Sequence, residues 1–325
     1  RTQPLIPMRT LLKITTSFAL ALVLTAGMAF GQNNATVNQN GGNNGANLIQ
    51  EFQGSDGEND AFIYQDGQGN KVFEYGQRGS GNLLDIVQDG HGNIVEPYPE
   101  QGDKSGLSFL GETDIDQLGD NNTIWDADQE GYSNYSKIEQ TTNGNFVDIE
   151  AQVNPDGGEG TGNSVTITQG TGNGNQVGTK DGNTGFFQYG QDNSATLDQD
   201  GTENKIGTDP VSGAPYAGKH DLSVSGQSGG PASEQGFVQK GMNNSAEVDQ
   251  SGSMNVVEYS LQAGSGNTLD ADQMGAGNMA RFSQVGSNNS ITLNQSVGLN
   301  DAGIFQHGTG NSANVTQTGG MGGGS

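Results

Sequence analysis

Paired carboxylates are the residues of this chain that come closest to catalytic or metal-binding chemistry. Two carboxylates two residues apart are typical of general acid–base work or of a hard-cation site. The Asp-x-Asp pairs are Asp114/Asp116, Asp126/Asp128 and Asp270/Asp272. Each pair falls on positions that, in the strands described below, face outward, so we expect solvated surface carboxylates and no catalytic residues.

Histidines and turn sequences give no stronger indication of a metal site. His91, His220 and His307 occupy unlike positions of the local pattern and form no ligand spacing. Turns such as QDGQGN and QDGHGN resemble those of calcium-binding β-rolls, but β-rolls need nine-residue repeats with a recurrent aspartate. Here the pitch is eleven or twelve and asparagine recurs instead. We therefore expect no enzyme, no metal and no cofactor, although outward Asp and Glu leave cation binding open.

Composition excludes several classes of protein. The chain has 325 residues, 55 of them glycine, a formal net charge of −25 and only 30% hydrophobic residues, too few for an ordinary helical core. No basic stripe is present to neutralise phosphates, so a nucleic-acid partner is not expected. The chain has no cysteine, which excludes disulfides and thiolate metal sites.

A repeat fills most of the chain. Glutamine is followed five places later by asparagine, with glycine usually at the second position between them, and the next glutamine comes six or seven places further on. The clearest examples of these amides are Gln65, Asn70, Gln88, Asn134, Gln140, Asn193, Gln199, Asn244, Gln250, Asn267, Gln273, Asn278, Gln284, Asn289, Gln295, Gln306, Asn311 and Gln317.

The repeat predicts a strand followed by a tight turn. In QVGSNNSITLNQ, from Gln284 to Gln295, the residues Asn289, Ile291, Leu293 and Gln295 alternate with polar ones, as in a strand with one buried face. The segment between each glutamine and asparagine is short and contains glycine, which permits positive φ. Two units make one coil, and about eleven coils stack into an all-β β-solenoid with the cross-β character of amyloid.

Stacking explains why the amides share the phase of the aliphatic residues. Equivalent residues of successive coils lie about 4.8 Å apart. A buried amide is costly unless it is hydrogen-bonded, but identical amides at this spacing can donate to and accept from one another, as in cross-β ladders. We therefore predict buried glutamine and asparagine ladders at the two ends of each strand.

The repeat lapses near residues 96–111, 153–162, 178–185 and 207–235, which predicts loops protruding from the stack. The prolines of the mature chain lie in or between these lapses, as expected because interior strands do not tolerate proline. Where the next glutamine comes seven places on, as from Asn70 to Gln77, we predict a β-bulge.

The N-terminal 31 residues have the features of a signal peptide. Arg9 and Lys13 precede or interrupt an apolar run, FALALVLTAGMAF, and small residues precede a predicted cleavage site before Gln32. Residues 1–7 precede Met8 and are consistent with a start placed too far upstream. The predicted solenoid spans 32–317, and residues 318–325 form a glycine-rich tail.

The repeat resembles the curlin repeat of curli fibre subunits, the secreted functional amyloids of bacterial biofilms. Three segments match it best: QDGQGN from Gln65, QAGSGN from Gln262 and QHGTGNSANVTQ from Gln306. The resemblance covers roughly residues 33–317 and is to the major fibre subunit, although familiar curlins have fewer repeats and lack such insertions. It implies secretion through an outer-membrane pore with accessory factors, and nucleated polymerisation at the bacterial cell surface.

The ends of the repeat array predict self-association. The first and last units are regular and no amphipathic capping helix follows, so each end presents a template for another subunit. We expect a head-to-tail homopolymer in an extracellular fibre of a biofilm matrix, aided by a nucleator subunit. The alternatives are a minor nucleating curlin and a monomeric solenoid adhesin. Outward Phe62, Tyr64, Leu83 and Val87 break the polar pattern and form a candidate docking patch.

Overall fold

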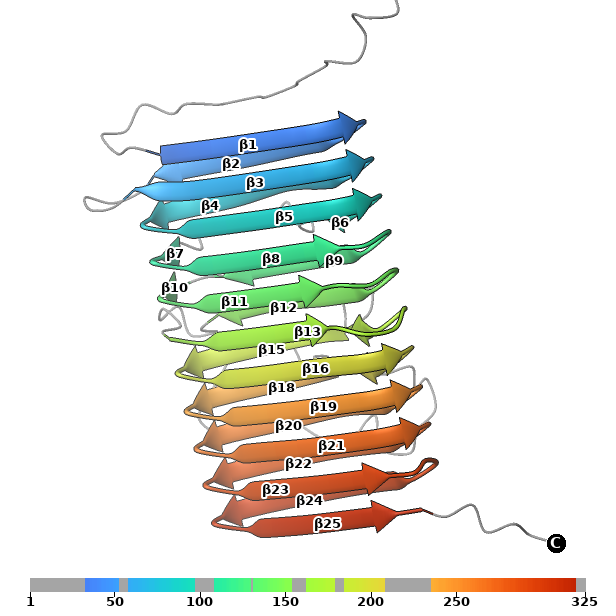
Figure 1. Ribbon diagram of the computed structural model, residues 1–325. Coiled ribbons are helices and arrows are strands. Elements are labelled where there is room, and N and C mark those ends of the chain that lie inside the picture. Colours follow the sequence, from blue (N-terminus) through green and yellow to red (C-terminus); the bar gives the residue numbers. More distant parts are fainter. Residues whose placement is uncertain are drawn as a thin grey trace, which may run out of the picture.

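The computed structural model describes residues 33–52, 58–96, 108–129, 131–153, 162–178, 184–207 and 235–319. The predicted signal peptide, the centres of the four predicted insertions and the end of the tail lie outside these residues. The described residues contain strands and turns only, and the strands stack across the long axis of the molecule (Figure 1). No helix among them is long and apolar enough to span a membrane.

Two parallel sheets run the length of the stack. Sheet A has eleven strands, taken in the order of their stacking. They are β1 (Asn33–Gly42), β3 (Asn59–Gln68), β5 (Leu83–His91), β8 (Glu112–Leu118), β11 (Tyr135–Gln140), β13 (Ser164–Gln169), β16 (Ser194–Thr202), β19 (Ser245–Ser253), β21 (Thr268–Ala276), β23 (Ser290–Ser296) and β25 (Ser312–Thr318).

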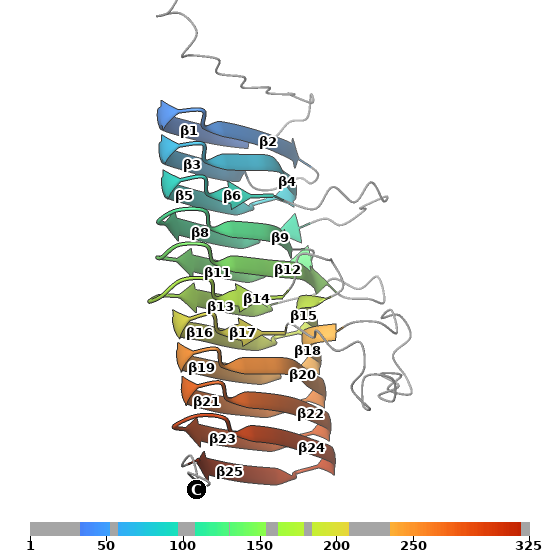
Figure 2. The same ribbon diagram turned by 90° about the vertical axis from the view of Figure 1, so that its right-hand side faces the viewer.

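Sheet B has fourteen strands and faces sheet A across the core (Figure 2). They are β2 (Gly45–Phe52), β4 (Lys71–Ser80), β6 (Ile94–Val95), β7 (Ser108–Phe109), β9 (Thr123–Gln129), β10 (Gly131–Tyr132), β12 (Phe146–Val153), β14 (Gln176–Val177), β15 (Thr184–Gln191), β17 (Lys205–Ile206), β18 (Gln235–Met242), β20 (Val256–Ser265), β22 (Met279–Ser287) and β24 (Asp301–Thr309). The chain alternates between the sheets, so the fold is the predicted β-solenoid.

Sheet A keeps one register throughout. Each strand pairs with the next residue for residue and without a shift, from Gln39 opposite Gln65 to Gln295 opposite Gln317. Its inward aliphatic residues form one continuous column of the core. The fully buried members include Ile63, Ile86, Ile115, Ile138, Ile167, Leu197, Val248, Ala271 and Leu293. The period-two phase of the sequence therefore sets the core of the molecule.

Sheet B is less regular. The predicted bulge between Asn70 and Gln77 is confirmed, because the pairing of β2 with β4 shifts between Ala46 and Leu48. Comparable shifts occur in β12 and in β20. The two-residue strands β6, β14 and β17 each end one residue before the chain leaves the described residues. When the chain returns to sheet B, β15 continues the path begun by β14, and β18 continues the path begun by β17. Three of the four predicted insertions thus interrupt rows of sheet B, whereas the one near 153–162 lies between β12 of sheet B and β13 of sheet A.

A second apolar cluster lies on the side of sheet B away from the core. It contains Phe187, Tyr189, Val238, Leu261 and Ala263, all less than a tenth exposed. These residues alternate along β15, β18 and β20 with inward residues such as Phe186 and Phe237, whose rings stack at 5.4 Å in the main core. The sequence pattern, which assigns one buried face per strand, did not predict this cluster.

Two turn positions require positive φ. The glycine two residues after glutamine is one of them: a Cβ on Gly264, at φ +117°, would collide with the carbonyl oxygen of Gly286 in the next coil. The residue just before each asparagine is the other, and it is occupied by glycine or by residues such as Met254 at φ 55°. The tight stacking of the turns therefore depends on backbone conformations that glycine adopts most easily.

Candidate assembly surfaces and amide ladders

One glutamine ladder runs unbroken through all eleven strands of sheet A. In each coil the side-chain Nε2 donates to the Oε1 of the equivalent glutamine in the next coil, at 2.6–2.9 Å. The ladder contains Gln39, Gln65, Gln88, Gln117, Gln140, Gln169, Gln199, Gln250, Gln273, Gln295 and Gln317. Every bond has the same direction, so the ladder is polar from the first coil to the last.

Sheet B carries a second glutamine ladder in two described pieces. Gln50 donates to Gln77, and a longer run contains Gln188, Gln239, Gln262, Gln284 and Gln306. The second hydrogen of each Nε2 reaches a backbone carbonyl of the other sheet, as from Gln284 to Thr268 at 2.9 Å. Both hydrogens of the interior amides, such as Gln284, are therefore bonded, which removes most of the cost of burying them.

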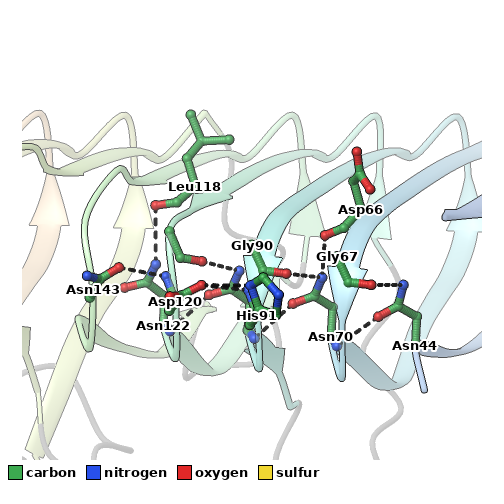
Figure 3. A network of polar contacts seen from close by, with 12 residues as sticks. Asn44, Asp66, Gly67, Asn70, Gly90, His91, Leu118, Asp120, Asn122 and Asn143 are labelled. Atoms are coloured by element: carbon green, nitrogen blue, oxygen red, sulfur yellow. Dashed lines mark hydrogen bonds and ion pairs between the residues drawn. The ribbon is translucent and has the colours of Figure 1, made fainter. Parts of the chain in front are cut away.

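The asparagines of the earlier coils bond differently from the mutual amide pairing expected from the sequence. Their Oδ1 atoms accept the backbone N–H of the equivalent asparagine in the next coil, as from Asn70 to Asn44 at 3.0 Å (Figure 3). Their Nδ2 atoms donate to turn carbonyls, as from Asn70 to Asp66 at 2.7 Å and to Gly90 at 2.9 Å. Asparagine thus joins the turn of its own coil to the turn and backbone of the neighbouring coils.

Amide-to-amide bonds between asparagines occur in the later coils in addition to these contacts. Asn289 Nδ2 lies 3.0 Å from Asn267 Oδ1, and Asn311 Nδ2 lies 2.9 Å from Asn289 Oδ1. One asparagine ladder is interrupted at Gly111. Its backbone N–H donates to Asn82 Oδ1, but glycine has no side-chain amide that could bond to the next coil. The substitution of glycine for asparagine at this position coincides with the insertion centred before β7.

The structure buries nearly all of the amides selected from the sequence. Sixteen of the eighteen are less than a tenth exposed, and the other two, Asn311 and Gln317, lie at the open end of the stack. Sequence reasoning overlooked the ladder members Gln169 and Asn175, because their separation is six residues instead of five. The signal that could have found them is the Gly-x-Gly-Asn end of that turn, from Gly172 to Asn175, which matches the end of the regular turn from Gly67 to Asn70.

The four residues of the candidate docking patch lie on neighbouring strands. Tyr64 of β3 is opposite Val87 of β5, and Phe62 and Leu83 are 36% and 44% exposed. These two side chains are not covered, in contrast to the buried cluster outside sheet B. Phe62 and Leu83 are therefore accessible near the first coils of sheet A, whereas Tyr64 and Val87 are half-buried.

The carboxylates form columns on the outer surface of sheet A. Asp198, Asp249 and Asp272 are stacked in register. Burial raises the pKa of Asp249, and neighbouring Glu247, Asp270 and Asp200 raise that pKa further. Among the described residues no group of three or more His, Cys, Asp or Glu side chains is arranged to hold a metal ion.

The other candidate residues do not come together. Asp114 lies 3.8 Å from Lys137, and His91 lies 3.2 Å from Asp120 at an exposed turn. His307 stands in β24 at the far end of the stack. His220 and the side chains of Asp126 and Asp128 lie outside the described residues.

The two ends of the stack are open among the described residues. β1 pairs only with β3, and β25 pairs only with β23, so one edge of each end strand offers its backbone groups. Their inward side chains are correspondingly more exposed: Val37 and Val315 are half-buried, whereas Val248 in the interior is fully buried. An open parallel edge with a continuous ladder is a template for another strand.

Comparison with known proteins agrees with the repeat architecture. Residues 264–296 match the family model described as the curlin associated repeat. This segment runs from the last two residues of β20 through β23 and contains the regular Gln-x-Gly and Asn-x-Φ-x-Φ-x-Gln pattern. No curated protein matches the chain.

Proposed function

We propose that this chain, which carries a curlin associated repeat, is a secreted structural subunit that polymerises end to end into extracellular curli-like fibres. Curlin-repeat proteins are structural components of extracellular fibres, and the β-solenoid has the parallel, stacked strands that such a fibre needs. We further propose that the chain is exported through an outer-membrane pore with accessory factors, polymerises on a nucleator subunit and contributes to a biofilm matrix, as the family resemblance implies.

The open ends of the stack formed by residues 33–319 are the single observation that carries the proposal. Monomeric solenoids need terminal coils with a polar outer surface to remain soluble. Here the end strands β1 and β25 repeat the interior pattern of inward amides and aliphatic residues. A contact between opposite ends of two copies does not close on itself, so it generates a filament.

Assembly of the secreted form, without residues 1–31, tests this function. We expect unbranched fibres in electron micrographs and loss of the monomer from sedimentation profiles, without added cofactor. A chain that stays monomeric while circular dichroism shows it folded would contradict the proposal and favour the adhesin alternative.

A matched pair of variants on β1 separates assembly from folding. Val37 is inward and half-buried at the open end, whereas Thr36 is outward on the same strand. Val37→Asn would place an amide without a partner in the contact between copies, and we expect it to slow elongation strongly. Thr36→Asn should assemble like the wild type; equal rates for the two variants would count against assembly through this edge.

A further inference from the structure

One coil in the interior of the stack lacks several interactions that hold the other coils together. It is the fourth coil, formed by β8 and β9, and Gly111 directly precedes β8. Gly111 belongs to a row of residues at the start of the sheet A strands, whose other members are asparagines. They are Asn33, Asn59, Asn82, Asn134, Asn163, Asn193, Asn244, Asn267, Asn289 and Asn311. The fourth coil alone lacks this side-chain amide.

An asparagine of this row joins its own turn to the neighbouring coil. Asn193 Oδ1 accepts the backbone N–H of Asn244 at 3.1 Å, and Asn193 Nδ2 donates to the carbonyls of Tyr189 and Gly241, both at 3.1 Å. Gly111 has no side chain to make the equivalent bonds to the fifth coil, which contains β11 and β12. The side-chain hydrogen bonds that connect successive coils along this edge are therefore interrupted at the fourth coil.

The residue before Gly111 adds an unfavourable backbone conformation at the same edge. Leu110 has φ 56° and is 65% exposed. The turns before Asn82 and Asn163 have Gly81 and Gly162 at this position, at φ 72° and 68°. A left-handed conformation is costly for a branched residue and easy for glycine, so the Leu110–Gly111 edge is less stable than these turns.

The core beside this edge is also less apolar than elsewhere. Thr113 of β8 is opposite Ser136 of β11, where later coils have Leu269 opposite Ile291. Ser136 is fully buried, and its Oγ has no hydrogen-bond partner. The interface between the fourth and fifth coils therefore buries a polar group without compensation and removes less apolar surface from water.

Pairing in sheet B is short or irregular at the fourth coil. β6 pairs with β9 through Ile94 and Val95, and β9 pairs with β12 with two register shifts. Four coils further on, β20 pairs with β22 from Val256 to Ser265 with a single shift. Sheet B thus adds less backbone hydrogen bonding at the fourth coil than in the later coils.

The opposite edge of the fourth coil is well bonded. Asn122 N–H donates to Asn93 Oδ1 at 3.0 Å, and Asp120 Oδ1 accepts the N–H of His91 at 2.8 Å (Figure 3). The glutamine ladder passes through Gln117 without interruption. The fourth coil is therefore anchored at the turn between β8 and β9 and weakly held at the edge where β8 begins.

We propose that the stack opens locally at the Leu110–Gly111 edge of the fourth coil before any other interior coil opens, and that fibres of this chain break there under shear. Each coil of a stack is stabilised by itself and its two neighbours, so a weak interface opens without unfolding the rest. The ladder through Gln117 lets the coil close again in the same register. A break exposes new strand edges that can template further chain. The consequence for fibres rests on the proposed function, whereas the local opening does not.

Amide hydrogen exchange of the folded chain, followed by mass spectrometry, tests the local opening. Peptides from β8 are compared with peptides from β19, which is also interior and also carries outward carboxylates. We expect the β8 amides to exchange at least about tenfold faster than those of β19. Equal protection of the two strands would overturn the proposal.

Two reciprocal variants test the cause. Gly111→Asn restores the missing amide and should slow exchange in β8 by about tenfold while leaving β19 unchanged. Asn163→Gly makes the reverse change in the same row and should speed exchange in β13 by a similar factor. Unchanged exchange in β8 for the first variant, or in β13 for the second, would overturn the proposal. Should Gly111→Asn fail to fold, Leu110→Gly replaces it and should slow exchange in β8 by a few-fold.

Shearing tests the consequence for fibres. After the same sonication, fibres of Gly111→Asn should be longer in electron micrographs than wild-type fibres. Equal lengths would overturn breakage at this coil and leave the proposed function standing. Hydrogen exchange reads the folded chain whether or not it assembles. Wild-type chain that forms no fibres therefore contradicts the proposed function, whereas equal protection of β8 and β19 contradicts only the local opening.

Discussion

Sheets A and B are built from the same repeat but treat additional residues differently. Sheet A pairs eleven strands without a single register shift. Sheet B contains the bulges, and its short strands β6, β14 and β17 end where the chain leaves the described residues. The comparison indicates that pairing in sheet A sets the register of the coils, whereas sheet B accepts inserted residues with a smaller loss of stability.

The position of the insertions supports this division. Ile206 pairs with Val257 and Phe237 pairs with Ser260, so β17 ends and β18 resumes on either side of Glu258, the bulge residue of β20. A strand that already tolerates one unpaired residue has no ladder bond to lose there. Residues inserted at that point leave the inward residues of β17 and β18 in register with those of β20.

The largest expected effect comes from adding one alanine to each sheet. Inserted after Val248 in β19, it moves Gln250 off the core face and breaks pairing with β16 and β21. Inserted after Glu258 in β20, it enlarges an existing bulge. We expect the first insertion to lower the free energy of unfolding by more than about 4 kcal/mol and the second by far less, measured by urea unfolding. Equal losses would remove the distinction between the sheets.

The next effect concerns the asparagine ladder beside sheet A. Asn289 is buried, accepts the N–H of Asn311 and donates to Gly308, whereas Asn294 points outward from β23. Asn289→Ala leaves these buried groups without partners and should cost about 1–3 kcal/mol. Asn294→Ala is the same chemical change at an outward site and should cost less than about 0.5 kcal/mol. Similar melting temperatures for the two variants would mean that the ladder does not stabilise the fold.

A smaller effect of opposite sign is expected in the turn between the sheets. Met254 is 55% exposed and has positive φ, whereas Met274 is similarly exposed but lies in β21. Met254→Gly should stabilise the protein by about 0.5–1 kcal/mol by relieving a left-handed conformation. Met274→Gly should destabilise it by a comparable amount, because glycine in a strand loses more chain entropy. Chemical denaturation of both variants checks the signs; two losses would contradict the turn geometry.

The smallest effect is the pH dependence of the carboxylate columns on sheet A. Burial first, and then neighbouring carboxylates, raise the pKa values of Asp198, Asp249 and Asp272. The folded state therefore binds protons more strongly than the unfolded state, so stability is greatest below the ordinary Asp pKa of about 3.9 and falls as pH rises through the raised values. Lowering the pH from neutral toward about 3.9 should therefore raise the urea concentration at the midpoint of unfolding.

Asp249→Asn should flatten this pH dependence, since it removes one raised pKa and relieves its neighbours. Asp89→Asn, an exposed residue on β5, makes the same change in net charge and serves as the control. An unchanged pH profile for Asp249→Asn, or an equal change for Asp89→Asn, would show that overall charge and not the column governs the dependence.

Much of this architecture follows from the repeat itself. Period-two alternation with an invariant spacing identifies the inward face of sheet A, and the seven-residue spacing from Asn70 to Gln77 identifies a bulge, as the structure confirms. The burial and bonding of the glutamines follow from the cost of an unpaired amide and from the spacing between coils. Such regular local rules suffice where every coil repeats its neighbour.

What the sequence did not predict depends on contacts that the repeat does not encode. The asparagines bind backbone groups of the adjacent turn, as between Asn70 and Gly90, because the turn brings a carbonyl within reach of Nδ2. The positive φ of Met254 arises from the path of that turn. The cluster around Phe187 and Leu261 lies outside sheet B, where a pattern with one buried face assigns solvent. Each depends on neighbours distant in the chain.

The axial repeat of the proposed fibre tests the central claim, that a polymer of this chain would continue the fold of its subunit. Eleven strands in sheet A at about 4.8 Å each give a subunit length of about 53 Å. Helical reconstruction from electron cryo-micrographs should show unbroken layers about 4.8 Å apart and a subunit repeat of about 53 Å, with no gap at the junction. A repeat that is not eleven strand spacings, or strands that do not lie across the fibre axis, would contradict the account.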